Sequence, residues 1–554
     1  MWQRLEALFA RRGNGRAGLT MLSDLYSFSE LHRHYRNCRR NKRNTMNALA
    51  FEIDAEANLL RLQRELRDHT YRPGRSICFI TDGPKPREVF AADFRDRVVH
   101  HLLVWHQERI FEPRFVRDSY ACRRGKGTLA ASDRLMTLLR RITANGQRPA
   151  WALKLDVASF FPSIHKQTLC DIIERQVRHP ELRWLTRTIL FHDPTTDYRF
   201  RSLDGRVPAP GNRRYPIPGH KSLFGKHNEC GLPIGNLTSQ FWANVYLNEL
   251  DHFAKRHLKC RHYVRYVDDI VLLSANPAEL CAWRDQIGDF LRTRLRLTLR
   301  GDQTDPFPIR QGVEFVGWKT WWNRRLVRRQ TLGNLQKRLQ GFERDAMAKV
   351  DPKGTVAVRL HASARQVRRP GSVRLRSVGQ LHSVLASYSG HLRHGAAFAD
   401  WLRVWAQHAW LPLLFTRHRW RVGERWRDRT FCRAGSFRRQ YAALLRSAGW
   451  KCLMFCFVGR FVEFYGPQRL IAERVLGLKR TYRPRGGFAF AAGFPVFRLP
   501  MFRQRALDSG VALVEIREQG ADATVGCRRR RMTMLWIPAG IAGRDRAVRR
   551  PAAR

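Results

Sequence analysis

Two adjacent carboxylates stand out in an otherwise apolar part of the chain. Asp268 and Asp269 lie between two short apolar runs, residues 262–267 and 270–274, a pattern that predicts a β-hairpin with the acids at its turn. Uncompensated charge is costly in such surroundings, so the pair requires a cation. Carboxylate oxygens suit Mg²⁺, which completes its shell with water and substrate phosphates. The alternative is an ordinary polar hairpin tip, because Asp is common in turns.

A third carboxylate follows an apolar strand far upstream. Residues 152–157 read as a buried strand that delivers Asp156, and only tertiary folding can bring this acid to the hairpin. Three carboxylates that meet at strand ends can form a two-metal centre for phosphoryl displacement. In that arrangement Asp156 and Asp268 bridge two Mg²⁺ ions, the Val157 carbonyl adds a ligand, and Asp269 is the more peripheral acid.

The elements that must position these acids alternate between helix and strand. Apolar residues at helical spacing and runs bounded by Gly and Pro predict helices over 47–66, 93–111, 159–176 and 236–256, and strands over 75–79 and 88–91. This order predicts an α+β fold. An arginine-rich stretch, 417–439, precedes residues that read as a separate small α/β unit.

The composition indicates a polyanionic partner. The 554 residues include 102 Lys and Arg against 47 Asp and Glu, a net charge of +55. Nucleic acid is favoured over a membrane, because no run of about 18 apolar residues is present. Arginine-rich composition on ordinary surfaces is the alternative. The 11 cysteines are scattered singly, which predicts reduced thiols rather than disulfides or a zinc site. Met1–Arg16 lacks a signal-peptide core, so the protein is expected to stay in the compartment that makes it.

Further motifs accompany the three acids in a fixed order: Lys85–Val89, Asp96–His101, Ser119–Thr128, Gly231–Gln240 and Gly312–Trp318. Their order and intervals resemble the successive motifs of reverse transcriptases over about residues 45–400. The resemblance implies a right-hand polymerase. Its fingers and palm would occupy residues 46–325 and its helical thumb and a basic linker residues 326–425, after a basic N-terminal extension of residues 1–45.

The resemblance also implies roles for individual residues. Arg87 and Lys85 would contact the triphosphate of the incoming nucleotide. Phe161 takes the steric-gate position, where a ring beneath the sugar excludes a 2′-hydroxyl and favours dNTPs; a core aromatic is the alternative. Lys126 would touch a template phosphate. Three residues of the Gly231–Gln240 motif would line the nucleotide site: Ile234, Gly235 and Gln240.

Two residues that differ from the usual reverse transcriptase motif indicate which type of reverse transcriptase the chain resembles. Many reverse transcriptases have Gln at the position of Ile234 and Pro at that of Gln240, and these departures, with Ser387–His391, resemble the enzymes of bacterial diversity-generating retroelements. That type implies a cytoplasmic, nucleoid-associated enzyme that copies a template RNA into cDNA with errors opposite adenine, for transfer into target DNA, helped by a small basic accessory protein. An aliphatic Ile234 offers only packing to the nucleotide, which is expected to lower fidelity; a faithful lineage variant is the alternative.

Other functions remain open. The enzyme alternatives are antiphage defence, retron-like and group II intron-like elements, and the non-enzyme alternative is an RNA-binding scaffold on a decayed palm.

Residues 426–554 resemble the mismatch-recognition domain of the MutS family. Phe461 and Glu463 match its Phe-x-Glu motif, whereas Val462 stands where Tyr is usual. In that family the Phe wedges between base pairs and the Glu bonds a mispaired base. The domain is therefore expected to hold cDNA, heteroduplex or target DNA; the alternative has Phe461 in the core and Glu463 on the surface.

Overall fold

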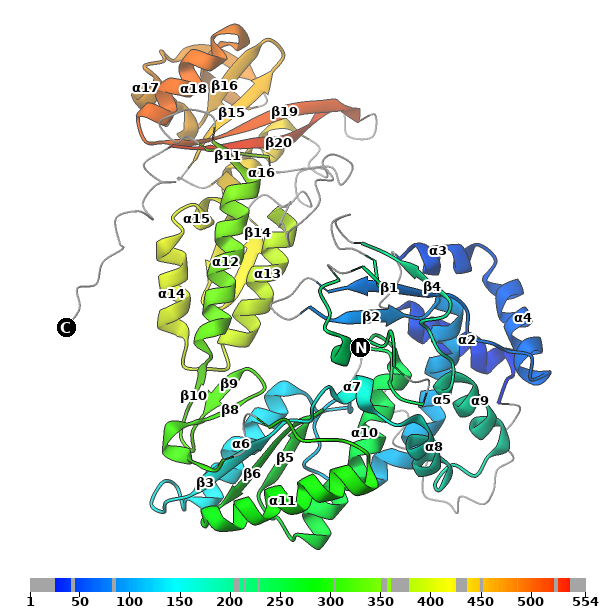
Figure 1. Cartoon of the computed structure of the whole chain (residues 1–554). Coiled ribbons are helices and arrows are strands. Elements are labelled where there is room, and N and C mark those ends of the chain that lie inside the picture. Colours follow the sequence, from blue (N-terminus) through cyan, green and yellow to red (C-terminus); the bar gives the residue numbers. More distant parts are fainter. Residues whose placement is uncertain are drawn as a thin grey trace, which may run out of the picture. The chain divides into compact units, whose positions relative to one another are not determined.

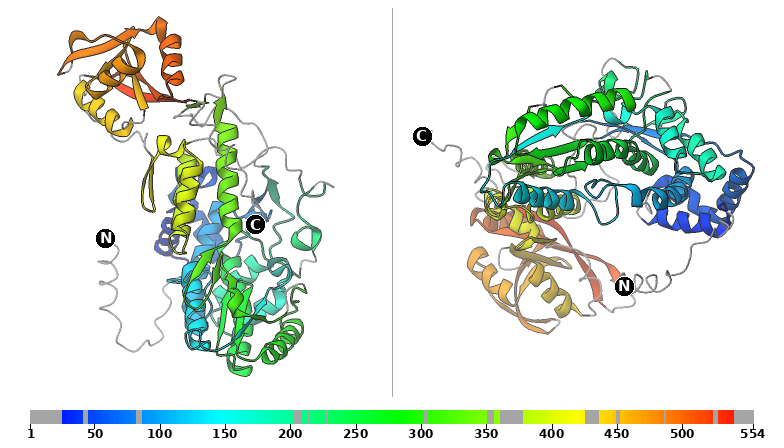
Figure 2. Two further views of the ribbon diagram at one scale, coloured as in Figure 1. Left: turned by 90° about the vertical axis from the view of Figure 1, so that its left-hand side faces the viewer. Right: turned by 90° about the horizontal axis from the view of Figure 1, so that it is seen from below.

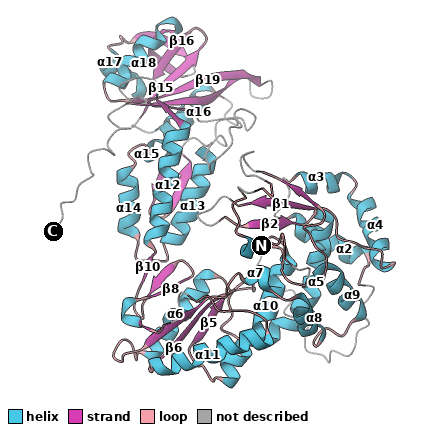
Figure 3. Ribbon diagram, in the orientation of Figure 1, coloured by secondary structure: helices cyan, strands magenta, loops and turns pink. Residues whose placement is uncertain are grey.

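The structure is a computed structural model (Figure 1) that describes residues 25–40, 45–81, 86–202, 209–212, 215–226, 229–301, 305–349, 356–359, 378–424, 436–448, 452–485, 487–522 and 527–538. The chain forms two compact units, the first from residues 1–134 and 150–307 and the second from 135–149 and 308–554. The division falls within α6 (Thr128–Ile142). Helices and strands mix in both units (Figure 3), as the α+β prediction requires.

The first unit is built around two buried helices, α5 (Phe94–Phe111) and α10 (Leu237–His252), which pack against each other. Helix α10 is apolar or buried on nearly every side, because other elements surround it. The remaining helices are α2 (Phe28–Arg39), α3 (Met46–Ile53), α4 (Ala55–Arg67), α7 (Phe160–Ser163), α8 (Lys166–Glu174), α9 (Pro180–Leu190) and α11 (Pro277–Arg294). A π-helical turn, η3 (Phe253–His257), continues α10.

Two sheets complete the first unit. One has the order β2-β1-β4 and contains β1 (Ser76–Ile80), β2 (Glu88–Ala91) and β4 (Tyr198–Phe200). The other has the order β5-β6-β3-β7 and contains β3 (Trp151–Leu155), β5 (Tyr263–Tyr266), β6 (Asp269–Ser274) and β7 (Phe307–Pro308). The predicted hairpin is confirmed, since β5 pairs antiparallel with β6, and the two strands expected over 75–79 and 88–91 are β1 and β2, which also pair antiparallel.

The second unit begins with a small sheet and continues in helices. The sheet has the order β10-β9-β8, with β8 (Val313–Phe315), β9 (Trp318–Thr320) and β10 (Arg325–Val327). The helices are α12 (Arg329–Ala346), α13 (Val378–Leu392), α14 (Phe398–Gln407) and α15 (Leu411–Leu414), followed by the hairpin β13 (Phe415–His418) and β14 (Arg421–Glu424). Trp401 and Trp410 are buried in the core of this part.

An eight-stranded sheet dominates the rest of the second unit (Figure 2). In spatial order it contains β11 (Met347–Lys349), β12 (Val356–Arg359), β20 (Cys527–Ile537), β19 (Ala512–Asp522), β15 (Cys452–Val458), β16 (Phe461–Tyr465), β18 (Phe488–Pro495) and β17 (Thr481–Arg485). Successive side chains of β15 enter two different cores, because a strand alternates its faces. Helix α16 (Phe437–Ala448) covers one face, and α17 (Pro467–Leu476) and α18 (Leu499–Asp508) cover the other.

Two predicted helices are interrupted. The helix expected over 47–66 is α3 and α4, which meet at Asp54, and the helix expected over 159–176 is α7 and α8, separated at Ile164. In both regions the helical spacing of apolar residues continues across the interruption, so this spacing alone does not reveal where the helix is broken. Within the described ranges no helix has the length and apolar character needed to cross a membrane. The nine cysteines whose side chains are described are free thiols.

Candidate active site

Strand register brings the three predicted carboxylates together. In the sheet of the first unit β3 runs antiparallel to β6, with Leu155 opposite Ile270. Asp156 directly follows β3, and Asp269 directly precedes Ile270. Because Val267 and Asp268 join β5 to β6 and Asp269 begins β6, the end of β3 meets the hairpin turn. The convergence that the sequence could only predict is therefore built by one antiparallel strand pair.

The hairpin turn has a strained backbone, and a buried arginine forms a hydrogen bond with it. Val267 has a φ of 56°, a region that β-branched residues rarely adopt and that costs on the order of 1–3 kcal/mol. The Arg265 guanidinium, fully buried, donates a hydrogen bond to the Val267 carbonyl (2.8 Å). Other guanidinium hydrogen bonds reach Asp251 Oδ1 (2.7 Å) and the Ser119 hydroxyl (3.0 Å). Sequence reasoning missed Arg265 and Asp251, because a buried ion pair leaves no local pattern.

Burial and mutual repulsion weaken the acidity of the hairpin carboxylates. Burial raises the pKa of Asp268, and the negative charge of Asp156 raises it further, whereas Arg87 opposes the shift. Burial also raises the pKa of Asp269 to about 6, against the opposing charge of Lys154. The like charges of these acids disfavour each other's ionised forms, an effect that a bound cation would reverse.

Two basic side chains partly compensate the acids. The Lys154 ammonium lies 3.3 Å from Asp269 Oδ1, and the Arg300 guanidinium lies 3.6 Å from Asp156 Oδ2. The backbone amide of Arg300 also donates to the Asp156 carbonyl (2.9 Å). Lys154 lies one residue before the end of β3, so the same strand delivers an acid and its counter-charge. Neither basic residue was singled out from the sequence.

The oxygen atoms of the three carboxylates suit a hard divalent cation, although their side chains do not form a compact metal-binding cluster. Among the described residues, no group of three or more His, Cys, Asp or Glu side chains is arranged to hold a metal ion. The chemistry nevertheless fits Mg²⁺, because three carboxylates meet two basic side chains here, and Asp269 Oδ1, buried and 3.3 Å from the Lys154 ammonium, has no other polar partner among the described residues. On either side of Val157, the Ala158 amide donates to the Thr298 carbonyl and the Asp156 carbonyl accepts from the Arg300 amide. Neither hydrogen bond uses the Val157 carbonyl.

The predicted nucleotide-binding residues surround the same strand end. Phe160 is buried and Phe161 is half-buried, with ring centroids 5.4 Å apart. The Phe161 carbonyl accepts a hydrogen bond from the Leu232 amide (2.9 Å), and the Ile234 carbonyl accepts one from the Phe90 amide (2.9 Å). The Gly231–Gln240 segment therefore bridges the start of α7 and strand β2.

Gly235 permits the close approach of that segment to β2. It has a φ of +122°, and an added Cβ would lie 2.7 Å from Val89 Cγ1 and 3.0 Å from the Phe90 carbonyl oxygen. A side chain at this position would therefore push the segment away from β2. Gln240 is exposed and accepts a hydrogen bond from the Cys122 thiol (3.7 Å).

Arg87 extends from the end of the β1–β2 hairpin. Its side chain is exposed, while its amide donates to the Thr81 hydroxyl (3.1 Å) and its carbonyl accepts from the Thr81 amide (2.9 Å). These bonds fix the backbone at Arg87 and leave the guanidinium free to reorient. Lys85, the other predicted triphosphate contact, lies outside the described residues.

Lys126 is held by its own loop. Its ammonium donates to the carbonyls of Arg117 and Ser119 and lies 4.7 Å from the centre of the Tyr120 ring. Burial lowers the pKa of Lys126 to about 8, and the charge of Arg123 adds to the effect. Template contact by Lys126 stays a prediction, and it would require these bonds to be exchanged.

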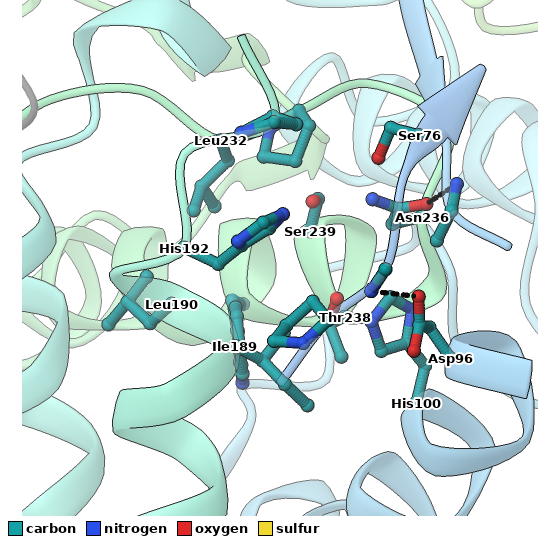
Figure 4. A pocket seen from close by; sticks show the side chains of 16 residues that line it. Ser76, Asp96, His100, Ile189, Leu190, His192, Leu232, Asn236, Thr238 and Ser239 are labelled. Atoms are coloured by element: carbon teal, nitrogen blue, oxygen red, sulfur yellow. Dashed lines mark hydrogen bonds between the residues drawn. The ribbon is translucent and has the colours of Figure 1, made fainter. Parts of the chain in front are cut away.

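A small pocket lined by both polar and apolar residues lies beside the Gly231–Gln240 segment (Figure 4). The Asn236 side chain accepts a hydrogen bond from the Ala92 amide (3.1 Å), which ties the start of α10 to the end of β2. Burial lowers the pKa of His100 to about 3, so its ring is neutral. The Asp96 carboxylate accepts from the Gly74 amide (2.8 Å). Asn236 and Asp96 therefore hold backbone at this pocket, whereas His100 Nδ1 and His192 Nε2 have no hydrogen-bond partner among the described residues.

The predicted wedge residues lie in the second unit, on β16. Phe461 is half-buried, whereas Glu463 is 2% exposed and accepts a hydrogen bond from the Tyr465 hydroxyl. This differs from both readings of the motif, in which Glu463 faces either a base or solvent. A base contact by Glu463 would require it to leave the core of the sheet.

Comparisons with known proteins agree with this geometry. Residues 85–319 match the family model "Reverse transcriptase (RNA-dependent DNA polymerase)". Protein YkfC of Escherichia coli is 24% identical, in a match that covers 49% of this chain and 71% of that protein. The uncharacterized 91 kDa protein in the cob intron of Schizosaccharomyces pombe is 24% identical, over 34% of this chain and 19% of its own length.

Among solved structures, telomerase from Candida albicans in complex with a TWJ fragment of telomeric RNA superposes with a TM-score of 0.32 and 10% identity, covering 60% of this chain and 56% of that one. So low a TM-score carries no argument about the fold. The chain thus spans little more than half of the telomerase and about a fifth of the intron protein. The family match contains all three carboxylates and the hairpin that presents them: residues 85–319 form a reverse transcriptase domain, an RNA-directed DNA polymerase.

Proposed function

We propose that the chain is a right-hand polymerase that copies RNA into DNA at Asp156, Asp268 and Asp269. The observation that carries the proposal is the meeting of β3 with the β5–β6 hairpin, which gathers three acids from distant parts of the sequence. Together with the Val157 carbonyl, the acids would hold two Mg²⁺ ions. Such ions, when bound, stabilise the attacking and leaving oxygens of nucleotidyl transfer.

The chain's own residues would bind and orient the nucleotide. Arg87, whose side chain is exposed and whose positive charge opposes the rise in the pKa of Asp268, would bind the triphosphate, and Lys85 would assist it. The half-buried ring of Phe161 would pack beneath the sugar and exclude a 2′-hydroxyl. Ile234 and its neighbour Gly235 would shape the floor of the site, because the hydrogen bond from Phe90 fixes their backbone.

We further propose mutagenic retrohoming in a diversity-generating retroelement as the biological setting. Ile234 and Gln240 support this, since both depart from the usual reverse transcriptase pattern in the same direction. The partners would be a template RNA, cDNA, target DNA and dNTPs, with a small basic accessory protein, in the bacterial cytoplasm near the nucleoid. Residues 46–325 would form fingers and palm, 326–425 the thumb and linker, and 426–554 a MutS-like nucleic-acid-binding domain.

A group II intron-like element is the second candidate. The observation that favours it is the similarity to a protein described as lying in the cob intron, though this match covers 19% of that protein. Antiphage defence and a non-catalytic scaffold remain weaker candidates, the latter because all three acids and Arg87 are present.

Primer extension tests the proposal. Purified protein with Mg²⁺ and dNTPs should extend a primer on an RNA template, and Asp268→Ala should abolish extension. Asp289→Ala is the matched control, since Asp289 is an exposed acid on α11 in the same unit. Errors concentrated at template adenines would support the retroelement, and accurate synthesis would favour the intron-like candidate. Loss of extension in both variants, or in neither, would contradict the assignment of Asp268.

A further inference from the structure

Two exposed aromatic rings face each other on the outermost hairpin of the eight-stranded sheet. Tyr482 on β17 is 69% exposed and Phe490 on β18 is 42% exposed. They are cross-strand partners, with ring centroids 5.7 Å apart and planes at 73°. Strand β17 ends the sheet, and edge strands usually carry charge rather than large apolar groups. An exposed pair at this place calls for a ligand that covers it.

The core of this unit is complete without the pair. Phe488, on the same strand as Phe490, packs against Phe437, Tyr441 and Tyr465 with ring centroids 5.1–6.4 Å apart. This aromatic cluster anchors the turn end of the hairpin, where Phe488 lies opposite Arg485. Tyr482 and Phe490 lie beyond it, so they do not contribute to that cluster.

One arginine lies against the pair, and the sequence around the pair is basic. The Arg480 guanidinium lies 5.3 Å from the centre of the Phe490 ring. Between Glu473 and Asp508 the sequence contains no acidic residue and eight basic ones. An acidic ligand is therefore favoured over an apolar protein segment, because charge complementarity governs such contacts.

We propose that Tyr482, Phe490 and Arg480 form a stacking platform for single-stranded RNA. Every base has a π-face that can stack on an aromatic ring, and the arginine side chain can contact base or phosphate. RNA is favoured over DNA because the Tyr482 hydroxyl, which forms no hydrogen bond with the described residues, can bond a 2′-hydroxyl. The proposed polymerase function is a second reason to expect RNA, whereas the platform itself does not depend on that function. This site is separate from the Phe461 wedge.

Binding of a labelled oligonucleotide of about 12 nucleotides, a length within the usual site sizes, tests the platform in the full chain. RNA and DNA of the same sequence are compared at raised salt, which suppresses the non-specific contribution of a highly basic chain. Tyr482→Ala and Phe490→Ala should each weaken RNA binding about tenfold or more. Leu470→Ala is the matched control, because Leu470 is 58% exposed in the same unit but carries no ring; it should leave binding unchanged.

Two further variants separate the contributions. Tyr482→Phe keeps the ring and removes the hydroxyl, so it should weaken RNA binding to the level of DNA and leave DNA binding as it was. Arg480→Gln should reduce the slope of log K against log salt by about 0.7 if it removes one phosphate contact on a single strand. All the altered side chains are exposed, so the melting temperature should not change.

Two results would overturn the platform. In the first, Tyr482→Ala and Phe490→Ala bind RNA as tightly as the parent protein does. In the second, these variants lose affinity for DNA but not for RNA. Primer extension distinguishes this from failure of the proposed function. These variants should still extend an annealed primer, since the catalytic acids belong to the other unit. A parent protein that binds RNA through the platform but extends no primer would refute only the polymerase proposal.

Discussion

Replacing Arg265 by Met should loosen the catalytic hairpin, because it leaves a buried carboxylate without its counter-charge. Arg265 and Asp251 are both fully buried, and two guanidinium nitrogens donate to the two Asp251 oxygens at 2.7 and 2.5 Å. Removing one partner of such a pair typically costs about 3–5 kcal/mol. The substitution also deprives the strained Val267 of the hydrogen bond to its carbonyl.

Hydrogen exchange of the β5–β6 amides measures the local loss of stability in Arg265→Met. A local measurement is needed because the two units of the chain need not unfold together. A loss of about 3–5 kcal/mol corresponds to exchange faster by hundreds- to thousands-fold. Primer extension should fall at least about tenfold, since the turn that carries Asp268 is no longer fixed.

A compensated variant separates stability from positioning. Arg265→Met combined with Asp251→Leu and Tyr263→Phe removes the pair and also the tyrosine hydroxyl that donates to Asp251 (2.6 Å). Apolar replacement of a whole buried ion pair is often neutral or stabilising, so slow exchange should return. Extension should stay low, because Val267 still lacks its donor. Normal exchange in Arg265→Met, or full activity in the triple variant, would refute this reasoning.

Three other substitutions test the nucleotide site. Gly235→Ala should destabilise the segment by about 1–3 kcal/mol, since its Cβ would overlap Val89, and steady-state extension should fall; activity equal to the parent would contradict the close approach to β2. Phe161→Ala should raise incorporation of ribonucleotides relative to dNTPs by about tenfold or more, measured as a ratio of kcat/KM; an unchanged ratio would return Phe161 to a packing role. Ile234→Gln should lower errors at template adenines by about tenfold in sequenced cDNA, and unaltered errors would place infidelity elsewhere.

Local patterns predicted the elements that carry the acids. The apolar runs around Asp268 predicted the hairpin because alternation and turn residues are short-range signals, and the helix expected over 93–111 is α5. The apolar strand before Asp156 was also expected, although its bounds differ by two residues at the C-terminal end.

Long-range pairing explains what the sequence could not reveal. Arg265 and Asp251 resemble surface charges in the sequence, and only the packing of β5 against α10 buries them together. Strands β11 and β12 were not predicted, because they pair with β20 from the far end of the chain. Glu463 was placed by family pattern alone, and the structure buries it. The convergence of acids was predictable from resemblance, but its basic neighbours Lys154 and Arg300 were not.

The pairing of β12 with β20 limits how this protein can be divided for expression. A fragment of residues 426–554 would lack β11 and β12 and would leave the backbone of β20 unpaired along a newly exposed edge, a surface prone to intermolecular pairing. A fragment that ends at 425 would keep those two strands with no sheet to join. Transfer of the C-terminal part to another protein would therefore have to carry residues 347–359 with it.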